Sequence, residues 1–135
     1  MERIHFLGPV QGADKECLLE NSKILVLPSY SENFGNVILE AMAQRCPVVV
    51  TPEVGLAELV REVGAGQVVE GEPKQLADGI QRLLQNPILR QQMGEAGQKI
   101  ARERFTWDGV AAQMEQLYGQ LIKSSRTADS LISAG

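Results

Sequence analysis

Two continuous apolar runs, separated by one helix-length segment, most constrain how this chain of 135 residues can fold. Residues 24–27 and 47–50 contain no charged side chain, which is typical of parallel strands buried on both faces of a sheet. Parallel neighbours need a crossover connection, and the segment between the runs has the apolar stripe of a helix. The residues of this stripe are Val37, Ile38, Ala41 and Met42. The sequence therefore predicts a strand–helix–strand unit.

The same alternation extends along most of the chain. Further strands are expected at residues 3–8 and 67–69, and further helices at 14–20, around 58–63, from Pro73, from Pro87 to about 104, and from Thr106. We expect an α/β fold with a parallel, Rossmann-like sheet of about four strands and helices on both faces. Residues 1–123 form one domain in this interpretation, and residues 124–135 form a flexible tail.

Composition excludes several classes of function. The net charge is −4, with acids and bases interspersed, so no basic stripe indicates nucleic-acid binding. No run approaches the ~18 apolar residues of a membrane-spanning helix, and the first residues lack the apolar core of a signal peptide. His5 is the single histidine, and Cys17 and Cys46 lack metal-site spacing. We expect no metal and no cofactor, reduced thiols, and a cytoplasmic location.

A polar turn joins the first apolar run to its helix, and two carboxylates bracket it. Glu32 lies in the turn and Glu40 lies in the helix, while Gly35 between them lets a ligand approach the backbone. A helix starting near Phe34 directs unpaired N–H groups and the positive end of its dipole into the turn, which favours phosphate. The two carboxylates would instead accept hydrogen bonds from hydroxyls on either side. Diphosphate flanked by hydroxylated rings describes a nucleotide-sugar.

These residues also resemble a known family. Pro28-Ser29, Glu32, Phe34-Gly35, Glu40-Ala41-Met42 and Pro47-Val48-Val49 resemble the E-x7-E segment of family-four retaining glycosyltransferases, which have the two-domain GT-B fold. The resemblance spans about residues 3–122 and corresponds to the latter part of the C-terminal, donor-binding domain. It implies that Glu32 and the residues around the helix start bind the donor sugar, and that Glu40 binds the ribose. The implied donor-sugar residues are Glu32, Asn33, Phe34, Gly35 and Asn36.

Two other turns follow strands and are therefore at the ligand-binding edge of an open sheet. The resemblance implies that Gly8 and Val10 lie near the nucleotide base, although an ordinary strand-to-helix turn explains them equally well. Thr51 and Gly55 either face the donor or serve ordinary turn chemistry. Asn33, Asn36 and Arg45-Cys46 depart from the commoner family residues, which leaves the preferred sugar open.

The resemblance also implies what lies outside this sequence. The acceptor domain, and an Arg and a Lys that contact the diphosphate, have no counterpart here. We therefore expect the chain to need a separate N-terminal acceptor portion as a partner and to be inactive alone. No catalytic residue is assigned. An uncovered sheet edge would favour self-association, and the full-length parent could also lie peripherally at the inner membrane.

Two other functions stay open at this stage. A non-catalytic nucleotide-sugar-binding or interaction module could keep the same fold without turnover. A plain α/β interaction domain of the receiver type would need an acidic cluster at strand ends and a Lys on a late strand, and neither pattern is evident. Glycosyl transfer is the interpretation that the full string of motifs favours.

Overall fold

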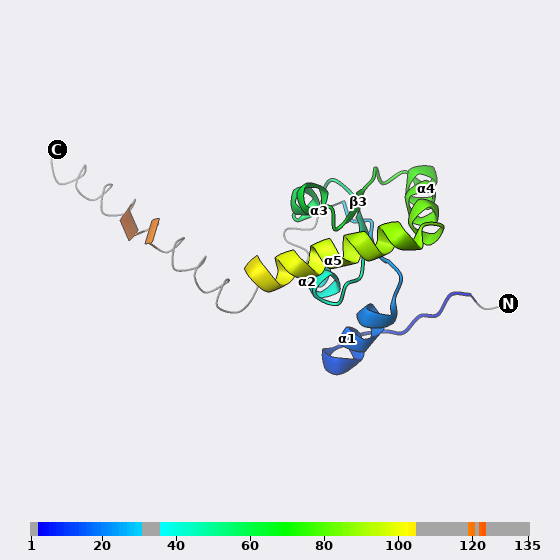
Figure 1. Cartoon of the computed structure of the whole chain (residues 1–135), viewed down its shortest axis with the longest axis horizontal. Helices are drawn as coiled ribbons and strands as arrows, with labels where there is room; N and C mark the ends of the chain where they lie inside the picture. Colours follow the sequence, from blue (N-terminus) through cyan, green and yellow to red (C-terminus); the bar gives the residue numbers. More distant parts are fainter. Residues whose placement is uncertain (1–2, 31–35, 105–118, 121, 124–135) are drawn as a thin grey trace. The chain divides into compact units, whose positions relative to one another are not determined.

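The structure is a computed structural model that describes residues 3–30, 36–104, 119–120 and 122–123 (Figure 1). The chain divides into one unit of residues Met1–Ala101 and a second of Arg102–Gly135. The elements are α1 (Gly12–Asn21), β1 (Leu25–Leu27), α2 (Asn36–Ala43), β2 (Val48–Val50), α3 (Ala57–Val63), β3 (Gly66–Val68), α4 (Pro73–Leu84) and α5 (Pro87–Arg104). In the second unit, residues 119–120 and 122–123 are helical.

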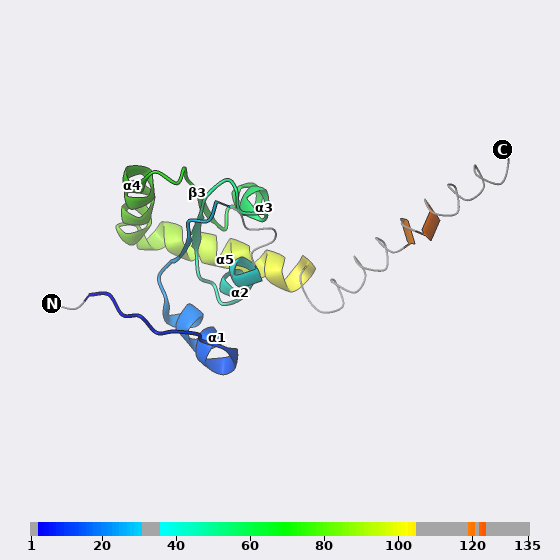
Figure 2. The same cartoon turned by 180° about the vertical axis from the view of Figure 1, so that it is seen from behind.

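The described residues form a three-stranded parallel sheet in the order β1-β2-β3. Leu25 pairs with Val48, and Val48 pairs in turn with Gly66. The central strand β2 is completely buried, whereas β1 and β3 are half-buried along their length. Helix α5 passes in front of the strands in Figure 1 and behind them in Figure 2, so it covers one face of the sheet. The predicted α/β fold with a parallel sheet is confirmed.

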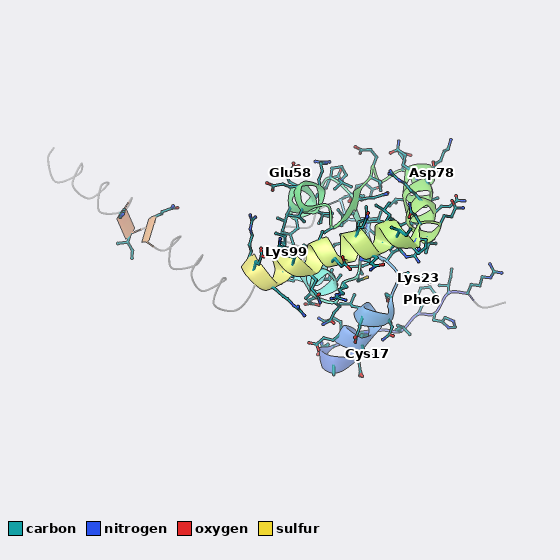
Figure 3. All side chains as sticks on the ribbon, viewed as in Figure 1. Phe6, Cys17, Lys23, Glu58, Asp78 and Lys99 are labelled. Carbon is teal, nitrogen blue, oxygen red and sulfur yellow. The ribbon has the colours of Figure 1, made fainter. Side chains whose placement is uncertain are left out.

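One expected strand is not formed. Residues 3–8 have no regular structure, and three of their apolar side chains are exposed: Ile4, Phe6 and Leu7. Figure 3 shows Phe6 on the segment that precedes α1, and its side chain is 98% exposed. A strand is stable only when a neighbour satisfies its backbone groups. Within the described part of the chain β1 pairs with β2 alone, so the predicted fourth strand was wrong for this structure.

The core surrounds β2 and is built from the residues that the helical stripe predicted. Ile38, Ala41 and Met42 of α2 are fully buried, and Val37 packs against them while half-buried. In α1 only Leu19 is buried, whereas the adjacent Leu18 is 43% exposed. Adjacent residues on a helix are about 100° apart, and a short surface helix buries only a narrow face.

The helix starts and ends follow local chemistry. Pro73 begins α4, and Asn86 accepts a hydrogen bond from the Leu89 N–H at 3.0 Å, which caps α5. At the end of α2, Arg45 adopts a left-handed conformation with a φ of 59°. The Arg45 and Cys46 N–H groups donate to the Met42 and Ala41 carbonyls, the pattern of a Schellman motif. Glycine is the usual residue at this position because it carries no Cβ.

Two glycines in α5 let this helix approach the core closely. An added Cβ at Gly94 would lie 2.4 Å from the Arg45 carbonyl oxygen, and one at Gly97 would lie 3.2 Å from Met42 Cγ. Both glycines are buried. Helix propensity alone would count both glycines as weakening the helix, because propensity does not include tertiary contacts. Their small size instead sets how near α5 lies to the end of α2.

Substitution of Gly94 by Ala should therefore destabilise the fold. Overpacking costs about 1–3 kcal/mol, and the upper part of that range, about 2–3 kcal/mol, applies here because the added Cβ would meet the Arg45 backbone carbonyl and not a flexible side chain. The higher helix propensity of Ala offsets about 1 kcal/mol of this. We expect a net loss of about 1–2 kcal/mol in the free energy of unfolding, measured by urea denaturation. Lys99→Ala, at an exposed position of the same helix, is the matched control and should leave stability almost unchanged. Equal stability of Gly94→Ala and wild type would contradict the close approach.

Candidate functional site

Glu40 is the predicted site residue whose surroundings the structure describes most fully. It is the fifth residue of α2 and lies on the half-buried side of that helix, between the buried residues Ile38 and Ala41. Asn36, the first residue of α2, is exposed. Glu32, Asn33, Phe34 and Gly35 lie outside the described residues. The described part of the predicted donor site therefore consists of the helix start at Asn36 and the carboxylate of Glu40.

Glu40 faces a hollow between α1 and α2. The hollow has a volume of about 320 Å³ and contains both apolar and polar groups. Its lining residues are Gly12, Lys15, Glu16, Leu19, Glu40, Ala43 and Gln44. Leu19 and Ala43 provide apolar surface, and the charged side chains provide hydrogen-bonding groups. A hollow of this kind fits one ring of a ligand with hydroxyl substituents better than it fits a purely apolar molecule.

Lys15 pairs with Glu40 across this hollow. The Lys15 Nζ atom lies 2.9 Å from Glu40 Oε2, and the two side chains are 35% and 40% exposed. Glu40 Oε2 is buried and accepts no hydrogen bond of good geometry from the described residues. Its contact with Lys15 is therefore an attraction between opposite charges and not a well-aligned hydrogen bond. The exposed surface of the Glu40 side chain therefore belongs to its other atoms.

A second group of residues meets at the carboxyl ends of the strands. Thr51 follows β2 directly, is 1% exposed, and donates its hydroxyl to the Ser29 carbonyl oxygen at 2.5 Å. Ser29 lies two residues after the end of β1. Gly71, which follows β3, lies close to both Tyr30 and Thr51, since an added Cβ at Gly71 would lie 3.6 Å from the Tyr30 ring and 3.7 Å from Thr51. Thr51 thus connects the ends of β1 and β2.

The other predicted positions lie in turns. Gly8 adopts a positive φ of 70° in the segment before α1, and Val10 is half-buried two residues before Gly12 of the hollow. Gly55 is exposed in the turn between β2 and α3. The roles assigned to Gly8, Val10, Thr51 and Gly55 remain predictions. Glu58, in the first turn of α3, is exposed and pairs with Arg61 at 2.6 Å.

Two site features were missed by sequence reasoning. Lys15 is separated from Glu40 by 25 positions, so no motif spacing connects them. A usable signal was present, however, because Lys15 lies one helical turn before Leu19, the single buried residue of α1, and so shares its face. The proximity of Tyr30 to Gly71 depends on the arrangement of β1 and β3 on either side of β2, which no local pattern specifies.

The described residues have neither a candidate metal site nor a helix that could span a membrane. These residues contain no group of three or more His, Cys, Asp or Glu side chains arranged to hold a metal ion. None of their helices has the length and apolar character needed to cross a bilayer. Cys17 is an exposed free thiol and Cys46 is a buried one. The pKa of the Cys46 thiol is raised to about 11, because the effect of burial, which raises the pKa, exceeds that of a hydrogen bond with the Leu25 backbone, which lowers it.

Comparison with known proteins gives consistent matches. The family model described as "Glycosyl transferases group 1" matches residues 1–100. The chain is 35% identical over 127 residues to a D-inositol 3-phosphate glycosyltransferase of Salinispora tropica, with 93% of this chain and 26% of that protein covered. It is 34% identical over 120 residues to a phosphatidyl-myo-inositol mannosyltransferase of Mycobacterium leprae, with 87% and 32% covered.

A solved structure supports the same relationship. Sucrose-phosphate synthase from Thermosynechococcus elongatus matches with a TM-score of 0.71 and 35% sequence identity, covering 85% of this chain and 30% of that one. The expected resemblance and the GT-B type of fold are therefore confirmed. The chain spans about a quarter to a third of the length of these relatives.

The link between Thr51 and Ser29 can be tested directly. Thr51→Val removes the hydroxyl and leaves the Ser29 carbonyl without this donor, so we expect a loss of about 1 kcal/mol in the free energy of unfolding. Amide hydrogen exchange should also become faster at residues 29–30. Thr51→Ser keeps the hydroxyl and should retain the wild-type exchange at these residues. Unchanged exchange in Thr51→Val would show that this hydrogen bond does not hold the end of β1.

Proposed function

Because this chain belongs to the glycosyl transferases group 1, we propose that it forms the donor-binding portion of a retaining enzyme that transfers a sugar from a nucleotide-sugar to an acceptor. In this proposal Glu40 accepts hydrogen bonds from the ribose. Glu32, Asn33, Phe34, Gly35 and Asn36 bind the donor sugar and its phosphates. The observation that supports the proposal most directly is the partly exposed carboxylate of Glu40 in a hollow beside the helix that follows the turn.

The chemistry of α2 is consistent with this division of roles. Its first N–H groups lack partners within the helix and favour an anion, whereas a carboxylate would repel phosphate. Glu40 lies four residues after Asn36, about 6 Å further along the axis at ~1.5 Å per residue. That separation suits a ribose attached to a diphosphate at the helix start. Glu40 therefore fits a hydroxyl-binding role better than a phosphate-binding one.

The proposed reaction needs groups beyond those assigned here. Departure of a nucleoside diphosphate requires stabilisation of the charge that develops on it, and backbone N–H groups supply part of this. We propose that cationic side chains and the acceptor site come from an N-terminal portion of the enzyme, and that this chain alone does not turn over. No divalent metal is required in this scheme. No observation favours the alternative of a non-catalytic module.

Donor binding can be measured with isothermal titration calorimetry. UDP-, GDP- and ADP-sugars are titrated into the chain, and the tightest-binding donor is then tested with Glu40→Ala. Loss of hydrogen bonds to a charged group costs about 1.5–3 kcal/mol, so affinity should fall by roughly ten- to a hundredfold. Glu20→Ala removes an exposed carboxylate of α1 that does not line the hollow and serves as the control. Unchanged affinity in Glu40→Ala would remove this residue from the site.

The edge of the sheet suggests a second property. In the part of the chain that the structure describes, β1 pairs with β2 only, and an unpaired edge of apolar residues can add a strand from another molecule. We propose that the isolated chain self-associates through β1. Sedimentation velocity should show a concentration-dependent increase in mass, which Val26→Lys should suppress because Lys disfavours edge pairing. A monomer at all concentrations would contradict this proposal.

A further inference from the structure

The charge pair of Lys15 and Glu40 has a chemistry that neither residue has alone. A carboxylate only accepts hydrogen bonds, and an ammonium group only donates them. The two groups lie 2.9 Å apart and both line the hollow between α1 and α2. Side by side, they form an adjacent acceptor and donor. Two neighbouring hydroxyl groups on one ring match this arrangement, since each hydroxyl can donate one hydrogen bond and accept another.

The geometry of the pair leaves hydrogen-bonding capacity for a ligand. Glu40 Oε2 is buried against Lys15 and accepts no well-aligned hydrogen bond from the described residues. The exposed part of the Glu40 side chain therefore belongs to its atoms other than Oε2, and Oε1 is one of these. Lys15 is 35% exposed and has three N–H donors, of which one suffices for Glu40. Both partners can therefore bind a ligand without breaking their contact with each other.

The position of the pair also favours a specific role over simple helix pairing. An ion pair whose side chains are 35% and 40% exposed contributes little to stability, so its structural value is small. This pair instead lies in the wall of a hollow of about 320 Å³, with the apolar surface of Leu19 and Ala43 nearby. Apolar surface next to an adjacent donor and acceptor is suited to a ring that carries hydroxyls on one edge.

We propose that Lys15 and Glu40 together recognise a vicinal diol, and that Lys15 is the residue that makes this site distinguish a ribonucleotide from a deoxyribonucleotide. This inference rests on the proposed function for Glu40 and adds a second binding residue to it. Glu40 accepts a hydrogen bond from the 3′-hydroxyl of the ribose, and Lys15 donates to the oxygen of the neighbouring 2′-hydroxyl. Lys15 also holds the carboxylate in position for this contact.

The test compares UDP-glucose, GDP-mannose and ADP-glucose with their 2′-deoxy counterparts by calorimetry. Wild type should bind the tightest ribonucleotide donor about ten times more strongly than its 2′-deoxy form. Lys15→Met should weaken binding of the ribonucleotide by about tenfold and leave binding of the 2′-deoxy form nearly unchanged, so that discrimination disappears. Lys15→Arg keeps a donor with positive charge and should restore most of the discrimination. Lys23→Met, at an exposed position after α1, is the control for loss of positive charge.

Each alternative result has a distinct meaning. If Lys15→Met weakens both forms equally, Lys15 contributes only general attraction or helix packing and the inference is overturned. If it changes neither, Lys15 is not in the site, while a loss of affinity in Glu40→Ala would still support the proposed function. If wild type binds none of the three donors or their 2′-deoxy forms, the proposed function fails and this inference fails with it. Circular dichroism of Lys15→Met should match wild type.

Discussion

The pairing of β2 with a strand on each side is the constraint on which the rest of the structure depends. Val48, Val49 and Val50 are each 0% exposed, so their backbone groups must find partners within the protein. The parallel neighbours β1 and β3 provide these partners. Because all three strands point the same way, their carboxyl ends lie at one edge of the sheet. Thr51 and Ser29 are brought to that edge as a consequence.

The same constraint determines how the helices can support a binding site. A crossover between parallel strands places α2 against the sheet, with Ile38, Ala41 and Met42 fixed in the core. Those buried residues fix the backbone of Glu40 on the same helix, and the contact with Lys15 orients its carboxylate. α5 adds a second restraint, because Gly94 and Gly97 allow it to lie against the end of α2. A site on a helix held in this way is well ordered before a ligand binds.

Charge in the hollow is balanced locally. An uncompensated carboxylate next to apolar surface would be unfavourable, and the ammonium of Lys15 offsets this at 2.9 Å. The same ammonium would attract an anionic ligand toward a chain whose net charge is −4. Comparison with known glycosyltransferases places the chain in a family but does not identify these contacts. The pairing of Lys15 with Glu40 is therefore a feature of this molecule that has to be interpreted from its own geometry.

Much of the fold was predictable because it depends on local pattern. The apolar runs identified β1 and β2, the spacing of Val37 to Met42 identified the buried face of α2, and Asn86 with Pro87 identified the start of α5. These features depend on periodicity and capping, which neighbouring residues determine. The motif around Glu40 indicated the family correctly for the same reason, since its residues are close together in the sequence.

The sequence by itself thus determined the order and type of most elements, their core residues and the family. Only the tertiary structure decided that residues 3–8 do not pair as a strand, that Leu18 is exposed, and that Gly94 is required for close packing. It also placed Lys15 beside Glu40 and linked Thr51 to Ser29. These outcomes depend on contacts between residues far apart in the chain. Such contacts follow from how the helices and strands pack, and no local preference encodes them.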